Sequence, residues 1–251
     1  MTNRSFQLRA LVLVSHDFQE SSRMIEVLSQ ERGKLTLVCK GARRNKSGML
    51  NLTEPYTEAW MNIIEGRSSY YLKDGELIDA HPGLRKSIRR MGLAAFGTEL
   101  LRAILFEGTD EELFDFYRQF LKIVSQAPEE AATPLAGSYL LKLSSLIGFR
   151  PILGRCLICS KPIHPPCLFD LYGGGMVCGD HESPGIRIGE AIYEELKGYI
   201  LKSFKEIADQ PRPENEDAQR EAADLALRYF QIHTDRNGLK CLNLLQSLQV
   251  L

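Results

Sequence analysis

Four residues between positions 156 and 181 have the types and the spacing of a metal site. Cys156 and Cys159 form a C-L-I-C motif, and Cys178 and His181 form a C-G-D-H motif after eighteen intervening residues. Each pair encloses two residues, which is the chelating spacing of structural zinc sites. Three thiolates and one imidazole complete a tetrahedral shell and leave no open position for a substrate. The pattern therefore predicts one structural zinc ion per chain, bound by Cys156, Cys159, Cys178 and His181.

The same cysteines also allow a different fourth ligand or no metal at all. Cys167 and His164 lie between the two pairs, and either could replace His181. Unpaired cysteines also occur as small buried apolar side chains, although four of the six cysteines crowd into positions 156–178. A disulfide set fits less well, because the first residues (Met-Thr-Asn-Arg) contain no apolar signal segment and indicate the cytosol.

A basic segment without any acidic residue lies between positions 33 and 52. Such side chains can neutralise phosphates whatever the base sequence, so the segment predicts contacts to a DNA backbone. A solvated loop is the plainer alternative, since short basic runs are weak motifs. The predicted contact residues in and beside this segment are Lys34, Lys40, Arg43, Arg44 and Lys46.

A second basic cluster opens the helix that we expect over residues 84–106. Positive charge near a helix N-terminus opposes the helix dipole, which favours a functional reason for it. A solvated helix end is again the alternative. The four residues, added to the predicted DNA-binding set, are Arg85, Lys86, Arg89 and Arg90.

The elements that must position these residues change in character near position 81. Before it, short alternating or apolar runs predict five or so strands and a small closed barrel. Trp60 is expected in the core of the barrel, whereas one of the adjacent Tyr70 and Tyr71 must point outward and could stack on a base. The first expected strand lies within residues 6–22 and is continuously apolar over 9–14. The others cover residues 34–40, 55–64, 69–73 and 76–78, with a turn at Asp74-Gly75 between the last two.

After residue 81 the apolar residues recur with a helical period. Thr109 with Glu112 predicts a capping box, and Thr133 followed by Pro134 predicts a helix start that Gly148 closes at the other end. The cysteine segment therefore interrupts a set of helices. The expected helices cover residues 84–106, 109–126, 133–148, 189–208, 213–234 and a last one from 238.

Composition limits the possible functions. The 251 residues are 44% hydrophobic and 25% charged, which is enough for a real core, and no stretch approaches the ~20 apolar residues of a membrane span. The net charge of −1 means that any nucleic-acid binding must come from local patches. The phosphate-binding Walker motif, the zinc deaminase signature and the H-E-x-x-H motif are missing from the sequence, which favours a binding protein over an enzyme.

The order of these parts resembles the RecO family of bacterial recombination and repair proteins. The resemblance extends over nearly the whole chain. Three strings carry it: Lys40-Gly41-Ala42-Arg43-Arg44 with Lys46-Ser47; Gly148-Phe149-Arg150-Pro151 leading to Cys156, Cys159, Gly173-Gly174-Gly175 and Cys178; and Arg228-Tyr229-Phe230 with His233, followed by Leu239-Lys240.

The resemblance implies an α+β multidomain chain. An N-terminal OB-fold barrel (residues 1–80) would precede an all-helical domain (81–150 and 186–251) with an inserted zinc ribbon (151–185). It further implies a non-enzymatic cytoplasmic, nucleoid-associated protein that binds single- and double-stranded DNA. Such a protein anneals strands coated with single-strand-binding protein and works with RecR to load RecA. His181 departs from the usual fourth cysteine, but imidazole is an acceptable zinc ligand.

Two other classes of function compete with this expectation. A zinc-ribbon adaptor would bind proteins rather than DNA, and the acidic segment 214–217 together with the amphipathic helices would suit that role. An enzyme with an unrecognised carboxylate site would cleave or modify a substrate. A strand-annealing assay separates all three.

Overall fold

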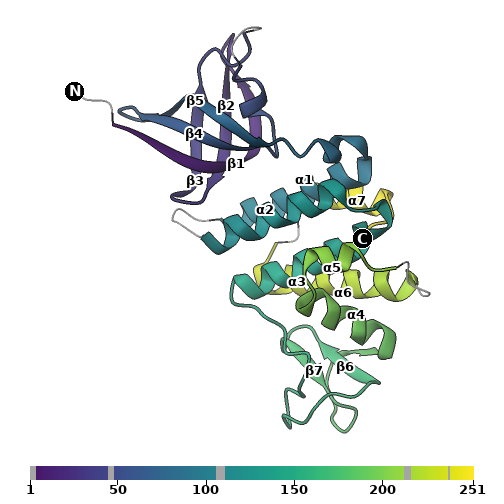
Figure 1. The fold of residues 1–251 in the computed structure, drawn as a ribbon. Coiled ribbons are helices and arrows are strands. Elements are labelled where there is room, and N and C mark those ends of the chain that lie inside the picture. Colours follow the sequence, from purple (N-terminus) through teal and green to yellow (C-terminus); the bar gives the residue numbers. More distant parts are fainter. Residues whose placement is uncertain (1–3, 45–47, 106–110, 212–215, 237) are drawn as a thin grey trace. The chain divides into compact units, whose positions relative to one another are not determined.

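Alternation of apolar and polar residues in the first eighty positions builds a five-stranded barrel. The computed structural model describes residues 4–44, 48–105, 111–211, 216–236 and 238–251. The strands are β1 (Ser5–Phe18), β2 (Ser22–Ser29), β3 (Gly33–Cys39), β4 (Glu58–Glu65) and β5 (Tyr70–Asp79). They close in the order β1-β2-β3-β5-β4, with β3 and β5 parallel and the other pairs antiparallel (Figure 1). The predicted OB-fold barrel is confirmed.

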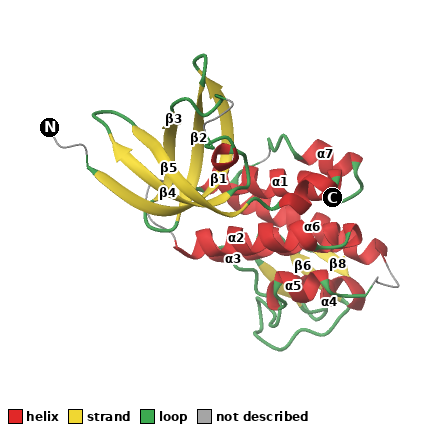
Figure 2. Cartoon of the chain, turned by 45° about the horizontal axis from the view of Figure 1, so that its top comes forward, coloured by secondary structure: helices red, strands yellow, loops and turns green. Residues whose placement is uncertain are grey.

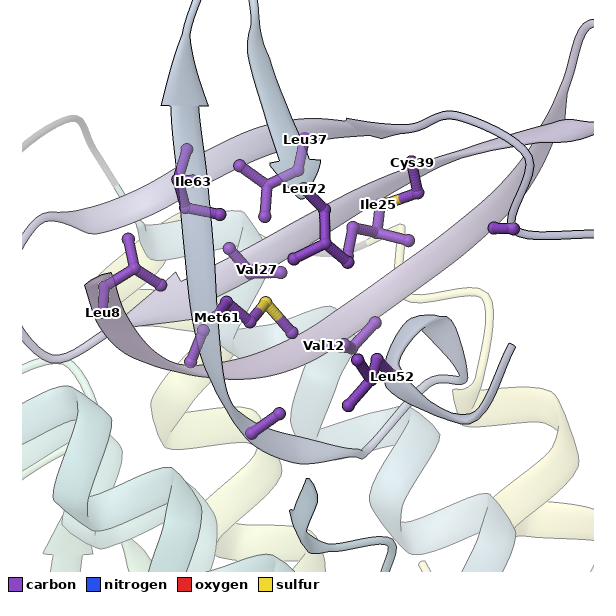
Figure 3. Packing of buried hydrophobic residues seen from close by; sticks show 13 residues of the cluster. Leu8, Val12, Ile25, Val27, Leu37, Cys39, Leu52, Met61, Ile63 and Leu72 are labelled. Atoms are coloured by element: carbon purple, nitrogen blue, oxygen red, sulfur yellow. The ribbon is translucent and has the colours of Figure 1, made fainter. Parts of the chain in front are cut away.

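The barrel core comes from alternate residues of all five strands. Leu8, Ala10 and Val12 of β1 point inward, and the side chains between them point outward. Figure 3 shows Leu8 and Val12 pointing into the barrel together with Met61 and Ile63 of β4. Each fully buried aliphatic side chain of this kind contributes about 1.5–3 kcal/mol relative to exposure.

Two strand predictions were wrong. Residues 22–29 were not predicted as a strand, yet they form β2, whose polar residues Arg23 and Glu26 are satisfied by ion pairs. The expected turn at Asp74-Gly75 lies inside the continuous strand β5. Gly75 is required there because a Cβ at this position would collide with the Trp60 carbonyl oxygen of β4. The glycine therefore marks a close approach of two strands and not a chain reversal.

The chain divides into two units. The first contains Met1–Gly83 and Leu100–Ser125, and the second contains Leu84–Glu99 and Gln126–Leu251. Helix α1 (Ile88–Ile104) contributes its residues to both units, and α2 (Glu111–Gln126) belongs to the first up to Ser125. The four-part division given from the sequence stays a prediction.

The last turn of α1 and helix α2 pack on the barrel within the first unit. Arg102 of α1 donates two hydrogen bonds to Glu26 of β2, at 2.9 and 2.8 Å. Arg9 of β1 lies over the ring of Phe114 in α2, at 6.0 Å from the ring centroid. Glu112 lies in the first turn of α2, but Thr109, its predicted capping partner, lies outside the described residues.

The second unit is a helical bundle around α3 (Ala132–Leu146). This helix packs on α4 (Glu190–Leu201) and α6 (Glu216–Thr234), and the short helices α5 (Phe204–Ala208) and α7 (Leu242–Ser247) complete the set (Figure 2). Buried aromatic residues fill the space between the helices. Tyr139 donates to the Gly97 carbonyl at 2.7 Å, and Tyr199 donates to the Gln219 carbonyl at 3.1 Å, so their hydroxyl groups stay paired inside the core.

Four helix boundaries differ from the predictions. The last helix was expected from residue 238 and begins at Leu242. Helix α3 begins at Ala132, after the 3₁₀ turn η3 (Glu129–Ala131), so Thr133 and Pro134 lie inside its first turn and form no cap. The single helix expected over 189–208 is two helices, because Ser203 and Glu206 form a capping box that starts α5. The helix expected from residue 84 is preceded by the 3₁₀ helix η2 (Pro82–Lys86). Gly148, with φ of 92°, ends α3 as expected.

A small sheet interrupts the bundle between α3 and α4. It contains β6 (Cys167–Asp170), β7 (Gly175–Val177) and β8 (Ile186–Ile188) in the order β7-β6-β8. The predicted insertion between helices is therefore confirmed. Among the described helices, none combines the length and apolarity that would be needed to cross a bilayer.

Candidate metal centre and nucleic-acid interface

The two Cys-containing motifs converge into one cluster. The ligand atoms of Cys156, Cys159, Cys178 and His181 all lie within 4.8 Å of one another. The sulfur atoms of Cys159 and Cys178 are 3.8 Å apart. Two thiolates bound at about 2.3 Å to a tetrahedral zinc ion would also be separated by about 3.8 Å. The cluster thus has the composition and the size of a four-coordinate metal site.

Backbone N–H groups favour the thiolate form of Cys156. The N–H groups of Ile158 and Cys178 each point at this sulfur, at 3.4 Å. Burial opposes charge on the thiol, but the backbone N–H groups of Cys159, Cys178 and Ile158 outweigh it and lower the pKa of Cys156 to about 6. A thiolate held in this way is the form that binds a metal.

The imidazole of His181 gives the strongest indication that the cluster fits a metal ion. Its Nε2 atom is buried and has no hydrogen-bond partner among the residues that the structure describes. Buried polar atoms in proteins are normally paired, so an unpaired ring nitrogen beside three sulfur atoms fits the role of a metal ligand. A metal ion on this cluster would satisfy it. The donor set fits zinc, which accepts Cys₃His coordination.

The alternative ligands lie outside the cluster. Cys167 is buried at the start of β6, where burial, reinforced by the nearby Glu190, raises the pKa of its thiol to about 11. A thiol in that state is a poor metal ligand. His164 is exposed and does not join the group of four. All six cysteines are free, so the disulfide alternative has no support in the structure.

Helices α4 and α6 hold the segment around the cluster. His233 Nε2 of α6 lies 2.8 Å from the Leu171 carbonyl oxygen, and its ring packs on Tyr229 at 4.3 Å between centroids. Tyr229 stacks in turn on Phe169 of β6 at 5.7 Å. Tyr193 of α4 donates to the Leu153 carbonyl at 3.3 Å. The inserted segment 151–185, which contains the cluster, therefore packs on the bundle through aromatic contacts and paired polar groups.

The basic segment after β3 is anchored by its own backbone. Ala42 is fully buried in the barrel core, Gly41 has φ of 69°, and Arg43 donates its N–H to the Ser21 carbonyl at 3.1 Å. The described part of the basic segment, residues 40–44, is therefore a turn held by backbone hydrogen bonds. Lys46 lies outside the described residues.

The side chains of this turn differ in how their charges are held. The Lys40 ammonium lies 4.6 Å from the centroid of the Tyr71 ring. Arg43 pairs with Asp17 at 3.3 Å, and both side chains are exposed. Arg44 is exposed and makes no ion pair within the described ranges. Lys40, Arg43 and Arg44 can therefore reach a phosphate at little or no cost in lost ion pairs.

A groove of about 700 Å³ lies on the outer face of β2 and β3, beside the β4–β5 loop. OB-folds bind oligonucleotides on this face and with this loop. Lys34 lines the groove, but its ammonium lies 3.5 Å from Glu26, which Arg102 also holds. Tyr70, a stacking candidate from the sequence, also lines the groove. The rest of the lining was not predicted, namely Met24, Leu35, Thr36, Val38, Glu65, Gly66, Arg67, Ser68, Ser69 and Leu105. Only the position of the β4–β5 loop in an OB topology could have pointed to Arg67.

The aromatic residues of the barrel are placed differently from the expectation for Trp60. Its side chain is 37% exposed, because it alternates with the inward-facing Ala59 and Met61 on β4. Tyr70 packs against the barrel core and against Phe6, whereas Tyr71 takes Lys40 on its ring. Tyr71 is thus the outward member of the pair.

The second basic cluster belongs to two elements and not to one helix. Arg85 and Lys86 are exposed in η2, and Arg89 and Arg90 lie in the first turn of α1. Arg89 also lines a hollow that contains Glu129, Glu130 and Glu216. Carboxylates therefore compete for part of this cluster.

The barrel topology, the basic turn, the groove and the inserted Cys/His cluster define an OB-fold protein with a group of residues that could hold a metal ion. Comparison with known proteins gives the family. Residues 1–81 match the family model described as Recombination protein O N terminal, and residues 85–242 match Recombination protein O C terminal. The chain belongs to the RecO family, which gives it a role in DNA repair.

Individual relatives agree with this assignment. The chain is 34% identical over 176 residues to a protein named DNA repair protein RecO from Thermoanaerobacter sp. (strain X514), covering 70% of each chain. It is 27% identical over 244 residues to the protein of the same name from Alkaliphilus metalliredigens, covering 94% of this chain and 97% of the relative. The similarity therefore includes both the barrel and the helical unit.

Proposed function

We propose that this protein binds single- and double-stranded DNA and anneals complementary strands without making or breaking a covalent bond. The observation that carries the proposal is the anchored basic turn on an OB barrel that also has an open groove on its β2–β3 face. Two DNA strands repel each other, and a protein that offers cations to both lowers that repulsion until the bases pair. The protein then acts as a recombination mediator and not as an enzyme.

The turn after β3 supplies the main phosphate contacts in this proposal. Lys40 and Arg44 have no carboxylate to leave among the described residues, and Arg43 leaves only the exposed Asp17. Lys34 would act more weakly, because Glu26 already holds it. The remaining proposed contacts are Lys46 and the second basic cluster of Arg85, Lys86, Arg89 and Arg90.

The proposed partners follow from membership in the family. We place the annealing on strands coated with single-strand-binding protein, in the cytoplasm at the nucleoid. RecR would join the protein on DNA, and RecA would be loaded as the indirect result.

The proposed cofactor is one structural zinc ion on Cys156, Cys159, Cys178 and His181. A bound zinc ion would supply charge compensation for three thiolates and a partner for the orphaned Nε2 atom. The residues of the cluster belong to two chain segments, so binding would hold these segments together and brace the helical unit. The DNA contacts proposed here lie elsewhere in the chain, on the barrel, η2 and the first turn of α1.

An annealing assay on protein-coated single strands, with and without divalent metal and nucleotide, tests the proposed function. Annealing without nucleotide is the expected result. No annealing combined with retained protein partners would favour the adaptor function, and cleavage of the DNA would favour an enzyme.

The contribution of the basic turn is tested by the salt dependence of DNA binding. A variant with alanine at Lys40, Arg43, Arg44 and Lys46 should lower the slope of log affinity against log salt by about 3–4 units. The control variant neutralises four exposed basic residues on helices, namely Lys122, Lys205, Arg220 and Arg228. An unchanged slope in the first variant, or an equal change in both, would remove the turn from the proposal.

Metal analysis tests the cofactor. Purified protein should contain about one zinc ion per chain, Cys178→Ser should lose it, and Cys167→Ser should keep it because Cys167 lies outside the cluster. At a free zinc concentration about a thousand times its Kd, binding would add about 4 kcal/mol to the stability of the site that it occupies. Protein without metal whose six thiols all react in the native state would contradict the proposal.

A further inference from the structure

The guanidinium of Arg32, in the barrel unit, lies on an aromatic ring and not beside a carboxylate of the described residues. Arg9, Arg23, Arg43 and Arg102 each lie within ion-pair distance of a carboxylate. Arg32 has no such partner among the described residues, and its guanidinium carbon lies 3.6 Å from the centroid of the Phe6 ring. Its side chain is exposed. The charge of Arg32 is therefore uncompensated, and an aromatic ring holds the guanidinium.

The turn between β2 and β3 fixes this arrangement. The Arg32 N–H donates to the Ser29 hydroxyl oxygen at 3.0 Å, which holds the backbone of the turn. The acidic neighbour, Glu31, accepts the backbone N–H of Arg9 on both carboxylate oxygens, at 3.2 and 3.1 Å. Glu31 is thus engaged with β1, and the guanidinium stays on Phe6.

Aromatic contacts connect Arg32 to the groove on the β2–β3 face. The ring of Phe6 meets the ring of Tyr70 edge to face, with centroids 6.0 Å apart and an angle of 79°. Tyr70 and Leu35 both line the groove, and together with Phe6 they pack on the barrel core. The order from the groove outward is Tyr70, Phe6 and Arg32.

We propose that Arg32, supported by Phe6, is a stacking subsite for one unpaired base of a DNA strand that leaves the groove. This inference rests on the proposed DNA binding. A guanidinium is planar and weakly hydrated, so a base can stack on its face while its N–H edge donates to a phosphate. Bases inside a duplex are already stacked on both faces, so only the terminal pairs have a free face. The subsite therefore selects single strands.

Substitution of Arg32 by lysine separates stacking from charge. Arg32→Lys keeps the positive charge but loses the planar group, whereas Arg32→Gln loses both. The affinity of Arg32→Lys for an oligothymidylate strand should fall about two- to fivefold, which is the range of exposed cation–π contacts, while its salt slope stays that of the wild type. Arg32→Gln should in addition lower the salt slope by about 0.7. Binding of a blunt duplex should be unchanged in Arg32→Lys.

A fluorescent base supplies a direct readout of stacking. A strand that contains 2-aminopurine should be quenched on binding by the wild type and less quenched by Arg32→Lys. Phe6→Leu should weaken single-strand binding in the wild-type background and have little effect in the Arg32→Lys background. Thermal unfolding of each variant checks that the barrel is intact. If Phe6→Leu does not fold, the comparison of Arg32→Lys with Arg32→Gln tests the subsite without it.

The outcomes separate this inference from the proposed function. Wild-type affinity and quenching in Arg32→Lys would overturn the subsite, and so would equal losses for single strands and duplex. In either case the proposed function would still hold if DNA binding is sensitive to salt and requires the basic turn after β3. A wild-type protein that binds no single strands would overturn both.

Discussion

Gly137 of α3 is a position where the usual effect of a helix substitution should change sign. Replacing an interior helix glycine by alanine normally stabilises a protein by about 1 kcal/mol, because alanine loses less backbone entropy on folding. At Gly137, however, a Cβ would overlap Cε2 of the Tyr199 ring and lie 2.8 Å from its Cδ2 and 3.0 Å from its Cζ. The ring and the helix cannot both keep their positions.

Tyr199 has little freedom to move away. It is 1% exposed, its hydroxyl donates to Gln219 of α6, and its own carbonyl accepts from Ser138 of α3 at 2.8 Å. Overpacking of this kind costs about 1–3 kcal/mol, and loss of a buried hydrogen bond adds about 1 kcal/mol. Together these outweigh the gain from helix propensity. Gly137→Ala should therefore lower the free energy of unfolding by about 1–3 kcal/mol.

Gly198 of α4 is the matched control. A Cβ there would meet only the Lys202 side chain, at 3.7 Å or more, so Gly198→Ala should stabilise the protein by about 0.5–1 kcal/mol. Urea unfolding of both variants and of the wild type measures the two differences. A stabilised Gly137→Ala protein, or equal shifts in the two variants, would refute the packing of Tyr199 on α3.

Two further predictions concern single charges. Asp17→Asn should raise DNA affinity about two- to fivefold in fluorescence anisotropy because it releases Arg43, and also the more distant Arg23, from the carboxylate. Glu20→Gln, in the turn that follows β1, should raise the affinity less, and equal effects would show a long-range field and not the ion pair. Burial, followed by the nearby Arg150 charge, lowers the pKa of Lys142 from 10.5 to about 8. The unfolded chain then binds more protons than the folded one between these values, so stability rises with pH from about 8 to 10.5. This rise should disappear in Lys142→Met in urea unfolding at several pH values, and a parallel pH dependence in both proteins would contradict the burial of that ammonium.

The metal cluster shows how far local spacing can predict a site. The two-residue spacing in each motif is a property of the chain itself, so Cys156 with Cys159 and Cys178 with His181 could be assigned as pairs. That the pairs meet, and that Cys167 stays away, depends on the packing of the segments around β6 and β7. The choice of His181 over Cys167 therefore needed the tertiary structure.

The barrel shows which features a local sequence pattern cannot predict. Strands with a strong apolar alternation, such as β1 and β3, were predictable because one face must be buried whatever surrounds them. Strand β2 was missed, since its Arg23 and Glu26 are tolerated only because other elements bring carboxylate and guanidinium partners. Trp60 was placed in the core by its residue type, but the register of β4 turns it outward.

The sequence alone therefore determined the types and the local order of the parts: an OB-like barrel, helices, a basic turn and a metal-competent insertion. These depend on periodicity and on contacts between near neighbours, which a single chain segment contains. The tertiary structure decided which charges are already paired, such as Lys34 with Glu26, and which are not, such as Arg32. Ion pairing and stacking join residues far apart in the sequence, so only the closed fold brings Arg32 onto Phe6 beside the groove.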